Sequence, residues 1–493
     1  SFPYESGETE NSLKHIDLTI HDGETILFCG ESGCGKTTLT RLINGLIPHY
    51  YTGKLDGKVL LDGKELKDYP LYQIGQRVGS VFQNPRTQFY NVDTTSEIVF
   101  GCENMGLPVP EMTRRLEDTT KSLKLEKLLN RSLFALSGGE KQKIACASAD
   151  AIQPDIFVLD EPSSNLDIAT IEDLMQVIRH WQSEQKTILV AEHRLYYLVP
   201  LADRIIYMKH GEISKEFTRQ QFQSLSPETL QGMGLRALDP FNLPPEAKPK
   251  AKPPTLHIKD FRFSYDKHGP LIVDIPDLTL PQGEIIGIIG NNGAGKSTFA
   301  RCLCGLDKRA LGELELNGHS YRAKQRCHIS YMVMQDVNHQ LFTEDVLDEL
   351  LLSMDGEDEK ENTERANQIL SSLDLADKIK LHPMSLSGGE KQRVAIGSAI
   401  ASNKEILVFD EPTSGLDYFH MVEVSDNLNR LKDMGKNLFL ITHDPELIYK
   451  CCTYLLFIQE NKVLWHRPMD DEAIKLLRAF FSHEKGADIT NAS

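Results

Sequence analysis

A set of sequence motifs occurs twice in this chain, in the same order each time. The four shared motifs are GESGCGKT at 30–37 and GNNGAGKS at 290–297, LSGGEKQ at 136–142 and 386–392, FVLDEP at 157–162 and LVFDEP at 407–412, and AEH at 191–193 and ITH at 441–443. Self-similarity over this much sequence indicates a duplicated domain. The chain is therefore expected to fold as two copies of one architecture.

Length and composition agree with two soluble domains. The chain has 493 residues, more than one hydrophobic core usually serves, and 40% of them are apolar. A net charge of −17 disfavours nucleic acid as a main partner. We find no apolar run near the roughly 20 residues of a membrane span and no signal peptide, so the chain itself is expected in the cytosol. The nine cysteines are scattered without metal-ligand spacing, which is typical of reduced, buried thiols.

The repeat predicts the domain boundaries. We expect a first domain at 1–234, a proline-rich linker at 235–254, a second domain at 255–480 and a polar tail at 481–493. Proline excludes helix and strand from the linker and favours an extended tether. The second copy starts with a strand-like segment at 255–261 that the first copy lacks, so we expect the first domain to miss its first strand and the native protein to extend about ten residues further.

Short apolar runs such as 285–289 predict buried parallel strands, with amphipathic helices between them. The fold class expected for each copy is therefore α/β. The first motif, Gly-x4-Gly-Lys-Thr/Ser after such a strand, is a phosphate cradle: glycines let the backbone approach, lysine neutralises phosphate, and the hydroxyl holds Mg²⁺. The candidate residues for binding the phosphates of a nucleotide are Gly30, Gly33, Gly35, Lys36, Thr37 and Thr38 in the first copy and Gly290, Gly293, Gly295, Lys296, Ser297 and Thr298 in the second.

An apolar strand that ends in Asp-Glu supplies the second part of a nucleotide hydrolase. Asp160 and Asp410 are placed to help hold Mg²⁺. Glu161 and Glu411, one residue further on, can polarise the attacking water. Together with the phosphate loops, these pairs predict nucleotide hydrolysis in both copies.

The LSGGEKQ motif resembles the signature of ATP-binding-cassette ATPases, and the chain from Tyr4 to about Phe480 is similar to two such cassettes in tandem. The resemblance implies P-loop ATPase domains of this type, each with a mixed or parallel core sheet, an antiparallel β part and a helical subdomain. It also implies that the two cassettes pair as a pseudo-twofold dimer in which signature residues act in trans. Ser387 and Gly389 would then serve the first phosphate loop, and Ser137 and Gly139 the second.

The resemblance assigns further positions. Tyr4 and Tyr265 correspond to the aromatic that stacks on adenine, and Asp167 and Asp417 close loops expected to cross the interface. The remaining positions are Gln83 and Gln335, which correspond to the glutamine that touches Mg²⁺ and water, and His193 and His443, which correspond to the histidine that contacts the γ-phosphate. The implied metal sets are Thr37, Gln83 and Asp160, and Ser297, Gln335 and Asp410. With no position missing, two competent sites are expected.

The segments at 82–89 and 100–107 resemble the ATPases of energy-coupling-factor transporters, which import vitamins and transition-metal cations. This implies an ABC importer subunit, peripheral on the cytoplasmic face of the cell membrane. Its partners would be a transmembrane coupling subunit and a membrane-embedded substrate-binding subunit. Acidic residues near the two glutamines are candidates to meet arginines of the coupling subunit. They are Asp93, Glu97, Glu344, Asp345, Asp348 and Glu349.

The competing class is a soluble mechanochemical ABC ATPase of translation or DNA repair. Versions with iron–sulfur or zinc modules need cysteine clusters, and the paired-cassette translation factors usually lack the histidine and carry a longer charged linker. A nucleotide-binding scaffold without turnover conflicts with Glu161 and Glu411. These arguments favour the importer.

A few positions differ between the copies. Asp150 stands where the second copy has Ile400, and Arg194 stands where it has Asp444. The differences suggest unequal partners or rates at the two sites. Cys34 lies inside the first phosphate loop, where a helix N-terminus is expected to lower the thiol pKa, and its alkylation is expected to block ATP binding there.

Overall fold

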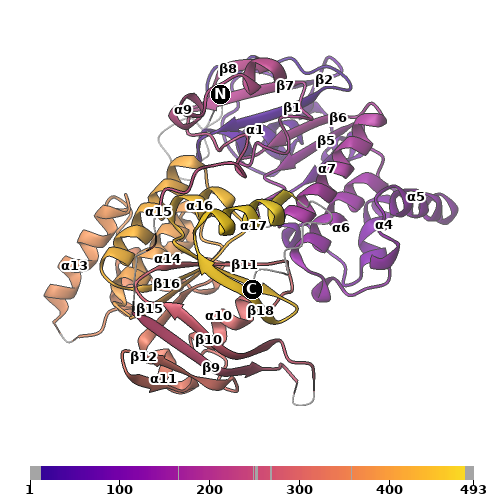
Figure 1. Cartoon of the computed structure of the whole chain (residues 1–493). Coiled ribbons are helices and arrows are strands. Elements are labelled where there is room, and N and C mark those ends of the chain that lie inside the picture. The colour runs from indigo at the N-terminus through magenta and orange to yellow at the C-terminus, as the bar shows by residue number, and fades with distance from the viewer. Residues whose placement is uncertain are drawn as a thin grey trace. The chain divides into compact units, whose positions relative to one another are not determined.

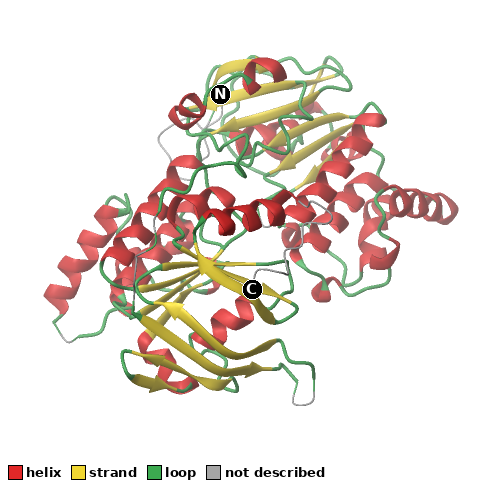
Figure 2. Cartoon of the chain, in the orientation of Figure 1, coloured by secondary structure: helices red, strands yellow, loops and turns green. Residues whose placement is uncertain are grey.

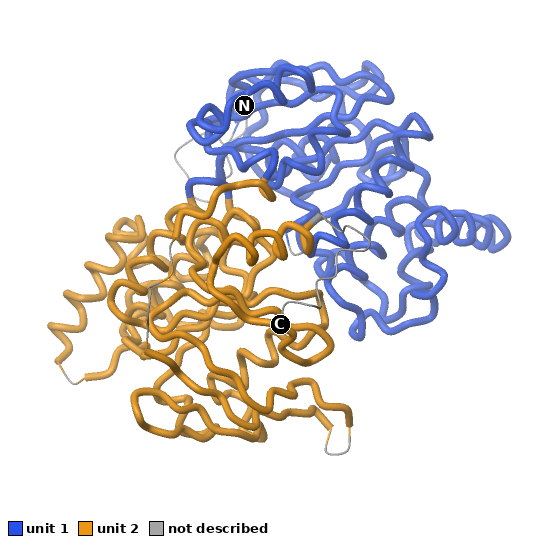
Figure 3. Tube along the Cα trace, in the orientation of Figure 1, with its two compact units in different colours: residues 1–239, 417–419 blue, residues 240–416, 420–493 orange. Residues whose placement is uncertain are grey.

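A computed structural model describes residues 13–164, 166–247, 249, 254–266, 269–356 and 358–482 of the chain (Figure 1). It divides into two compact units, Ser1–Asp239 with Asp417–Phe419, and Pro240–Leu416 with His420–Ser493 (Figure 3). The division at Asp239 and Pro240 falls inside the segment 235–254 that the sequence suggests as a linker.

The first unit is built on a six-stranded sheet with the order β4-β5-β6-β1-β7-β8. Its strands from β4 to β7 run parallel, and β8 pairs antiparallel with β7. The strands are β1 Thr25–Gly30, β4 Val78–Val81, β5 Ile156–Asp160, β6 Thr187–Ala191, β7 Arg204–Lys209 and β8 Glu212–Thr218, beside a short pair, β2 Leu60–Leu61 and β3 Lys64–Glu65. Because β1 is central, the loop after Gly30 lies at the middle of the carboxyl edge of the sheet.

Helices of the first unit cover both faces of this sheet (Figure 2). They are α1 Lys36–Ile43, α2 Leu46–His49, α3 Leu71–Arg77, α4 Thr94–Asn104, α5 Val109–Ser122, α6 Gly138–Ala151, α7 Ile168–Ser183, α8 Arg219–Gln223 and α9 Pro227–Gly232. Successive side chains of a strand point to opposite faces. Accordingly, Ile26 and Phe28 of β1 pack in one hydrophobic cluster while Leu27 and Cys29 pack in another.

The second unit repeats this sheet as β14-β15-β16-β11-β17-β18 and adds a four-stranded antiparallel sheet, β10-β9-β12-β13. Its strands are β9 Thr255–Phe263, β10 Val273–Pro281, β11 Ile285–Ile289, β12 Leu311–Leu316, β13 His319–Tyr321, β14 Ser330–Val333, β15 Ile406–Asp410, β16 Asn437–Ile441, β17 Tyr454–Gln459 and β18 Lys462–Pro468. The predicted strand 285–289 is β11, which pairs parallel with β16 and β17.

The helices of the second unit include a group that matches α4, α5 and α6 of the first, and each group packs as a helical subdomain. The helices are α10 Lys296–Leu303, α11 Ala323–Ile329, α12 Val346–Leu352, α13 Glu359–Ser372, α14 Gly388–Ala401, α15 Tyr418–Asp433, α16 Pro445–Cys451 and α17 Asp471–Ser482. The predicted fold class, two α/β domains with core sheet, antiparallel part and helical subdomain, is confirmed.

The described start of the linker is not a free tether. The Glu246 amide donates to the Tyr449 carbonyl at 2.8 Å, and the Tyr449 hydroxyl donates to the Phe241 carbonyl at 2.9 Å. This segment therefore lies on the second unit. Tyr4 and the expected missing strand fall outside the described residues. Within the described ranges, no helix is both long and apolar enough to cross a membrane.

Candidate nucleotide sites

Each phosphate loop follows the central strand of its sheet and requires glycine. Gly30 and Gly290 have φ of 151° and 146°, and a Cβ on either would overlap a carbonyl oxygen, that of Met208 or of Ile458. Gly35 begins α1 with φ 102°, in the left-handed region that favours glycine. The loops thus present bare backbone and a helix N-terminus, a cradle that fits phosphate groups.

The loop lysines are folded into these cradles. The Lys36 ammonium donates to the Gly30 and Glu31 carbonyls, both at 3.0 Å. Lys296 does the same with Gly290 at 2.8 Å and Asn291 at 2.9 Å. Both side chains are buried, so each positive charge is held at the point where the loop offers its donors.

A hydroxyl and a carboxylate meet beside each loop. The Thr37 hydroxyl donates to Asp160 Oδ1 at 3.2 Å. Burial and the neighbouring Glu161 charge raise the pKa of Asp160 to about 7, and burial raises the pKa of Asp410, which Ser297 hydrogen-bonds. Hydroxyl and carboxylate oxygens are ligands that Mg²⁺ accepts together with phosphate oxygens. These pairs fit the metal, which would neutralise phosphate charge there.

Glu161 lies between two side chains at the end of β5. The Gln83 amide donates to its Oε2 at 2.8 Å, and His193 Nε2 lies 3.3 Å from its Oε1. Burial raises the carboxyl pKa, but His193, Lys36 and Ser164 together lower it by more and leave the pKa of Glu161 below its usual value. The structure thus brings Gln83, Asp160, Glu161 and His193 together, as the sequence indicates.

The second cluster differs in detail. Glu411 Oε2 accepts from the Thr442 hydroxyl at 3.3 Å and from the His443 backbone amide at 3.2 Å. His443 Nε2 lies 3.8 Å from Glu411 Oε1 and 3.1 Å from Asn292 Oδ1 of the phosphate loop. The two glutamates therefore stand in different surroundings.

Comparisons with known proteins agree with two nucleotide sites. The family described as "ABC transporter" matches residues 13–164 and 273–414. The chain belongs to this family. A curated Treponema denticola relative, named "Putative ABC transporter ATP-binding protein", is 44% identical over 472 residues, which are 94% of this chain and 95% of the relative. The chain is accordingly a tandem ABC ATPase, and the family binds ATP with Mg²⁺.

Solved structures also resemble this ABC ATPase along its length. The structure titled "Model of ribosome-bound archaeal Pelota and ABCE1" covers 94% of this chain and 78% of its own, with a TM-score of 0.69 and 25% identity. A structure titled "RNase-L Inhibitor" covers 94% and 89%, with a TM-score of 0.62 and 23% identity, which shows the fold alone.

The likeness to the ribosome-bound structure contradicts the prediction of an energy-coupling-factor importer, and that prediction is wrong. The predicted partners, two membrane subunits and no nucleic acid, are wrong as well. The physical reason is that the segments at 82–89 and 100–107, on which the importer prediction depended, make contacts inside the first cassette. The Gln88 side chain accepts from the Phe82 amide and donates to the Ser80 carbonyl, and Cys102 is buried. Such contacts do not specify what the cassettes move.

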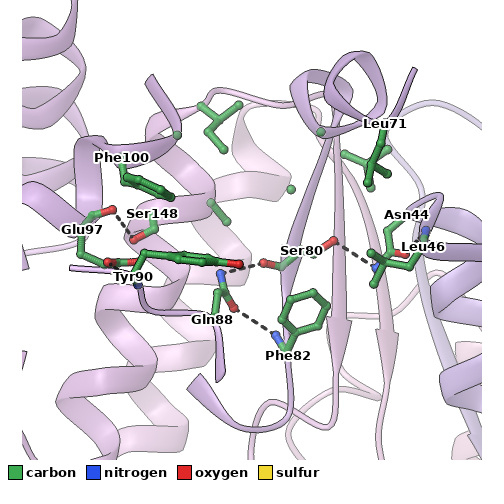
Figure 4. A pocket seen from close by; sticks show the side chains of 16 residues that line it. Asn44, Leu46, Leu71, Ser80, Phe82, Gln88, Tyr90, Glu97, Phe100 and Ser148 are labelled. Carbon is green, nitrogen blue, oxygen red and sulfur yellow. Dashed lines mark hydrogen bonds between the residues drawn. The ribbon is translucent and has the colours of Figure 1, made fainter. Parts of the chain in front are cut away.

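The acidic residues expected to meet a coupling subunit mostly hold their own loops. Asp93 caps α4, and buried Glu97 accepts from the Tyr90 and Asn91 amides at 3.1 and 2.8 Å. Asp345 and Glu349 do the same around α12, whereas Glu344 and Asp348 are exposed. A pocket of about 270 Å³ lies beside the first glutamine segment, and Figure 4 shows Glu97 at its rim with Tyr90 stacked near Phe100.

The signature residues begin α6 and α14. Ser137 and Ser387 cap these helices with Glu140 and Glu390 in capping boxes. A Cβ on Gly139 would lie 2.6 Å from Thr170 side-chain atoms, and one on Gly389 would lie 3.4 Å from Leu416. The predicted action of these four residues in trans stays a prediction.

The other predicted positions lie near the loops. The Tyr265 hydroxyl lies 3.1 Å from Thr298 Oγ1, and its ring is half exposed. Thr38 is buried in α1, and Gln335 is exposed after β14. Cys34 is 4% exposed, and this burial raises the pKa of its thiol although the Lys36 ammonium lies 3.8 Å from the sulfur. The prediction of a lowered thiol pKa is therefore wrong.

Sequence reasoning missed the residues that hold the histidine loops. Glu192 in the first cassette and Asp444 in the second bind the segments that follow Glu161 and Glu411, through Ser163 and Thr413 respectively. The available signal was the exchange of Glu192 and Arg194 for Thr442 and Asp444 between the copies.

Proposed function

We propose that both cassettes hydrolyse ATP, with Glu161 and Glu411 as the groups that polarise water. One observation carries this: each glutamate follows a buried aspartate at a strand end and lies near a histidine, at 3.3 Å for His193 and 3.8 Å for His443. A carboxylate in this position can take a proton from an attacking water.

The other roles follow from the contacts around each loop. Lys36 and Lys296 bind phosphate, and Mg²⁺ is held by Thr37, Asp160 and Gln83 in one cassette and by Ser297, Asp410 and Gln335 in the other. Tyr265 stacks on adenine. Gln83 and His193, with Gln335 and His443, contact the nucleotide and the water, since Gln83 and His193 already touch Glu161.

We further propose that hydrolysis does mechanical work on a complex of the translation machinery. The support is the likeness of nearly the whole chain, at 25% identity and a TM-score of 0.69, to a structure whose title names ribosome-bound ABCE1. Two ATPase domains in one chain suit this use, because ATP binding and hydrolysis can change how they are arranged.

The first experiment tests hydrolysis. Replacing both Glu161→Gln and Glu411→Gln keeps the side-chain shape but removes the base, so we expect steady-state ATP turnover to fall by about 10²-fold or more while ATP binding persists. Glu172→Gln, on the exposed face of α7, is the matched control and should turn over at the normal rate. Full turnover by the double variant would contradict the assignment.

The second experiment tests the partner. The Glu161→Gln and Glu411→Gln variant should trap ATP, so with ATP it should co-sediment with ribosomes from the same cells through a sucrose cushion. The Lys36→Ala and Lys296→Ala variant, which lacks the phosphate-binding charges, should not. Recovery of the trapped variant only in the membrane fraction would overturn the translation proposal and leave the hydrolysis proposal standing.

A further inference from the structure

A buried glutamate follows the segment that carries the glutamine in each cassette. Glu97 of α4 is 2% exposed, and Glu349 of α12 is 4% exposed. Neither belongs to the motifs that form the nucleotide sites. A buried carboxylate is costly unless hydrogen bonds satisfy it, so the donors around these two side chains indicate what they do.

In the first cassette, Glu97 joins the end of the glutamine segment to the helical subdomain (Figure 4). Its Oε2 accepts from the backbone amides of Tyr90 at 3.1 Å and Asn91 at 2.8 Å, and from the Asn91 side chain at 3.2 Å. Its backbone carbonyl accepts from the hydroxyl of Ser148 in α6, the helix that begins at the signature motif, at 3.1 Å. One residue therefore contacts both the segment and the signature helix.

The beginning of the same segment is held by the core sheet. The Gln88 side chain accepts from the Phe82 amide at 3.3 Å and donates to the Ser80 carbonyl of β4 at 3.0 Å. Gln83 directly follows Phe82, and its side chain donates to Glu161 at 2.8 Å. Gln83 thus lies on a short segment that β4 holds at one end and α4 holds at the other.

The second cassette repeats the connection to the helical subdomain. Glu349 Oε2 accepts from the backbone amides of Phe342 and Thr343, both at 3.1 Å. Its backbone carbonyl accepts from the hydroxyl of Ser398 in α14 at 3.4 Å. Because the donors are backbone amides, the contact is the same although the side chains at these two positions differ from those of the first cassette.

The connection to the core sheet recurs as well. The Gln340 side chain accepts from the Met334 amide at 3.1 Å and donates to the Met332 carbonyl of β14 at 3.3 Å. Gln335 directly follows Met334, so both glutamines stand on a segment that is held at two ends. A group that acts on Mg²⁺ and water needs such support, because a displacement of about 1 Å can lower a rate by about 10²-fold.

We propose that Glu97 and Glu349 are positioning residues, which set the places of Gln83 and Gln335 for hydrolysis by accepting the two backbone amides of each segment. This rests on the proposed roles of the two glutamines. Each glutamate acts through the segment, because the segment's own amides occupy its carboxylate.

Steady-state ATP hydrolysis by paired variants of the full chain tests this role, because a change in both cassettes leaves no unaltered site to mask it. Glu97→Met with Glu349→Met keeps the side-chain length and removes the acceptors. We expect kcat to fall by about tenfold or more and the KM for ATP to change by less than about twofold, because the phosphate loops are untouched. Glu97→Gln with Glu349→Gln keeps an oxygen that accepts both amides, so it should retain at least about half of the normal kcat.

Asp150→Ala is the control for a general loss of stability. It also removes a buried acceptor from the helical subdomain, but Asp150 serves Thr119 of α5 and Trp181 of α7 and not the glutamine segment. This variant should have a lower Tm and a normal kcat. If the methionine pair does not fold, Glu97→Asp with Glu349→Asp replaces it. That carboxylate is one methylene shorter and cannot reach both amides, so kcat should again fall.

A double-mutant comparison separates positioning from a merely structural role. Gln83→Ala with Gln335→Ala should lower kcat, and adding the methionine pair should lower it by less than about twofold more, because no glutamine is left to position. A normal kcat in the methionine pair, an equal loss in the glutamine pair at 97 and 349, or losses that multiply in the combined variant would each overturn the proposal. A normal kcat after replacement of Gln83 and Gln335 would instead refute their proposed role in hydrolysis, and with it this inference.

Discussion

The two cassettes agree in their backbones and differ in the side chains that support the chemistry. Their core sheets have the same strand order, and both phosphate loops leave the central strand through a glycine at φ near 150°. Yet Glu161 accepts a hydrogen bond from the Gln83 side chain. Glu411 instead accepts from the Thr442 hydroxyl and the His443 backbone amide, which follow β16 directly. The two copies thus share the phosphate loops, which depend on the backbone, more closely than they share the contacts of Glu161 and Glu411.

The helical subdomains show the same contrast inside the protein. In the first, Asp150 of α6 accepts from the Thr119 hydroxyl of α5 at 2.6 Å and from the Trp181 indole of α7 at 2.7 Å. In the second, the corresponding positions are Ile400, Ile369 and Leu431. One cassette joins three helices with a buried polar cluster, and the other has apolar side chains at the same three positions.

The largest effects should come from the glycine that both cassettes share. Gly30→Ala would press a Cβ against the Met208 carbonyl in a left-handed backbone, so we expect ATP affinity of the first site to fall on the order of 10²-fold. Gly290→Ala should do the same to the second site. Nucleotide binding measured by equilibrium dialysis checks both, and each variant should retain one site. Gly75→Ala, where a Cβ meets nothing within 4 Å, is the control.

A smaller effect, on the free energy of unfolding, should distinguish the first helical subdomain from the second. Asp150→Ala leaves the Thr119 and Trp181 donors buried without an acceptor, which should lower the free energy of unfolding by about 2 kcal/mol. Urea denaturation followed by far-UV circular dichroism measures this.

The matched variant makes the cluster apolar, as in the second cassette, but keeps a ring against Phe157, on which Trp181 stacks at 3.7 Å. Asp150→Ile, Thr119→Val and Trp181→Phe together remove donors and acceptor alike, so this variant should lose less stability than Asp150→Ala. An equal loss in the two variants would show that packing volume, not hydrogen bonding, explains the effect.

Sequence patterns predicted the parts that depend on local order along the chain. The loop at 30–37, the strand ends at Asp160 and Asp410, and the buried strand at 285–289 could be predicted because each is a contiguous stretch of sequence. The contacts around Glu161 could not be predicted in this way, because Glu192 binds Ser163, which lies 29 residues earlier in the sequence. Likewise, charge near the glutamine did not reveal that Glu97 turns inward to bind the amides of Tyr90 and Asn91.

A pH dependence should follow from Asp160 and Asp410, the buried aspartates that we propose hold Mg²⁺. The folded-state pKa of Asp160 is raised to about 7, above its ordinary value of 3.8, so the folded protein holds a proton that the unfolded chain loses. Its stability without Mg²⁺ should therefore decrease as pH rises from about 4 to 7 and stay reduced above 7.

The Asp160→Asn side chain cannot ionise. In EDTA, this variant should therefore have a Tm a few degrees above that of the natural protein at pH 8 and close to it at pH 5. About 1 kcal/mol moves Tm by roughly 2–4 °C in a domain of this size. Asp410→Asn should shift in the same direction, because burial also raises the pKa of Asp410. A larger gap at pH 5 than at pH 8 would contradict the raised pKa.

The smallest effect concerns a thiol that only the first loop carries, because Cys34 stands where the second loop has Ala294. Burial raises the pKa of the Cys34 thiol, so little thiolate exists near neutral pH, whereas Cys327 is exposed. Iodoacetamide at pH 7.5 should therefore label Cys34 at least about tenfold more slowly than Cys327, as followed by peptide mass spectrometry, and turnover should persist while Cys327 reacts. Rapid labelling of Cys34 would mean that the loop opens in solution far enough to expose the sulfur beside Lys36. In that event the loss of ATP binding on alkylation, still a prediction, should affect the first site and spare the second.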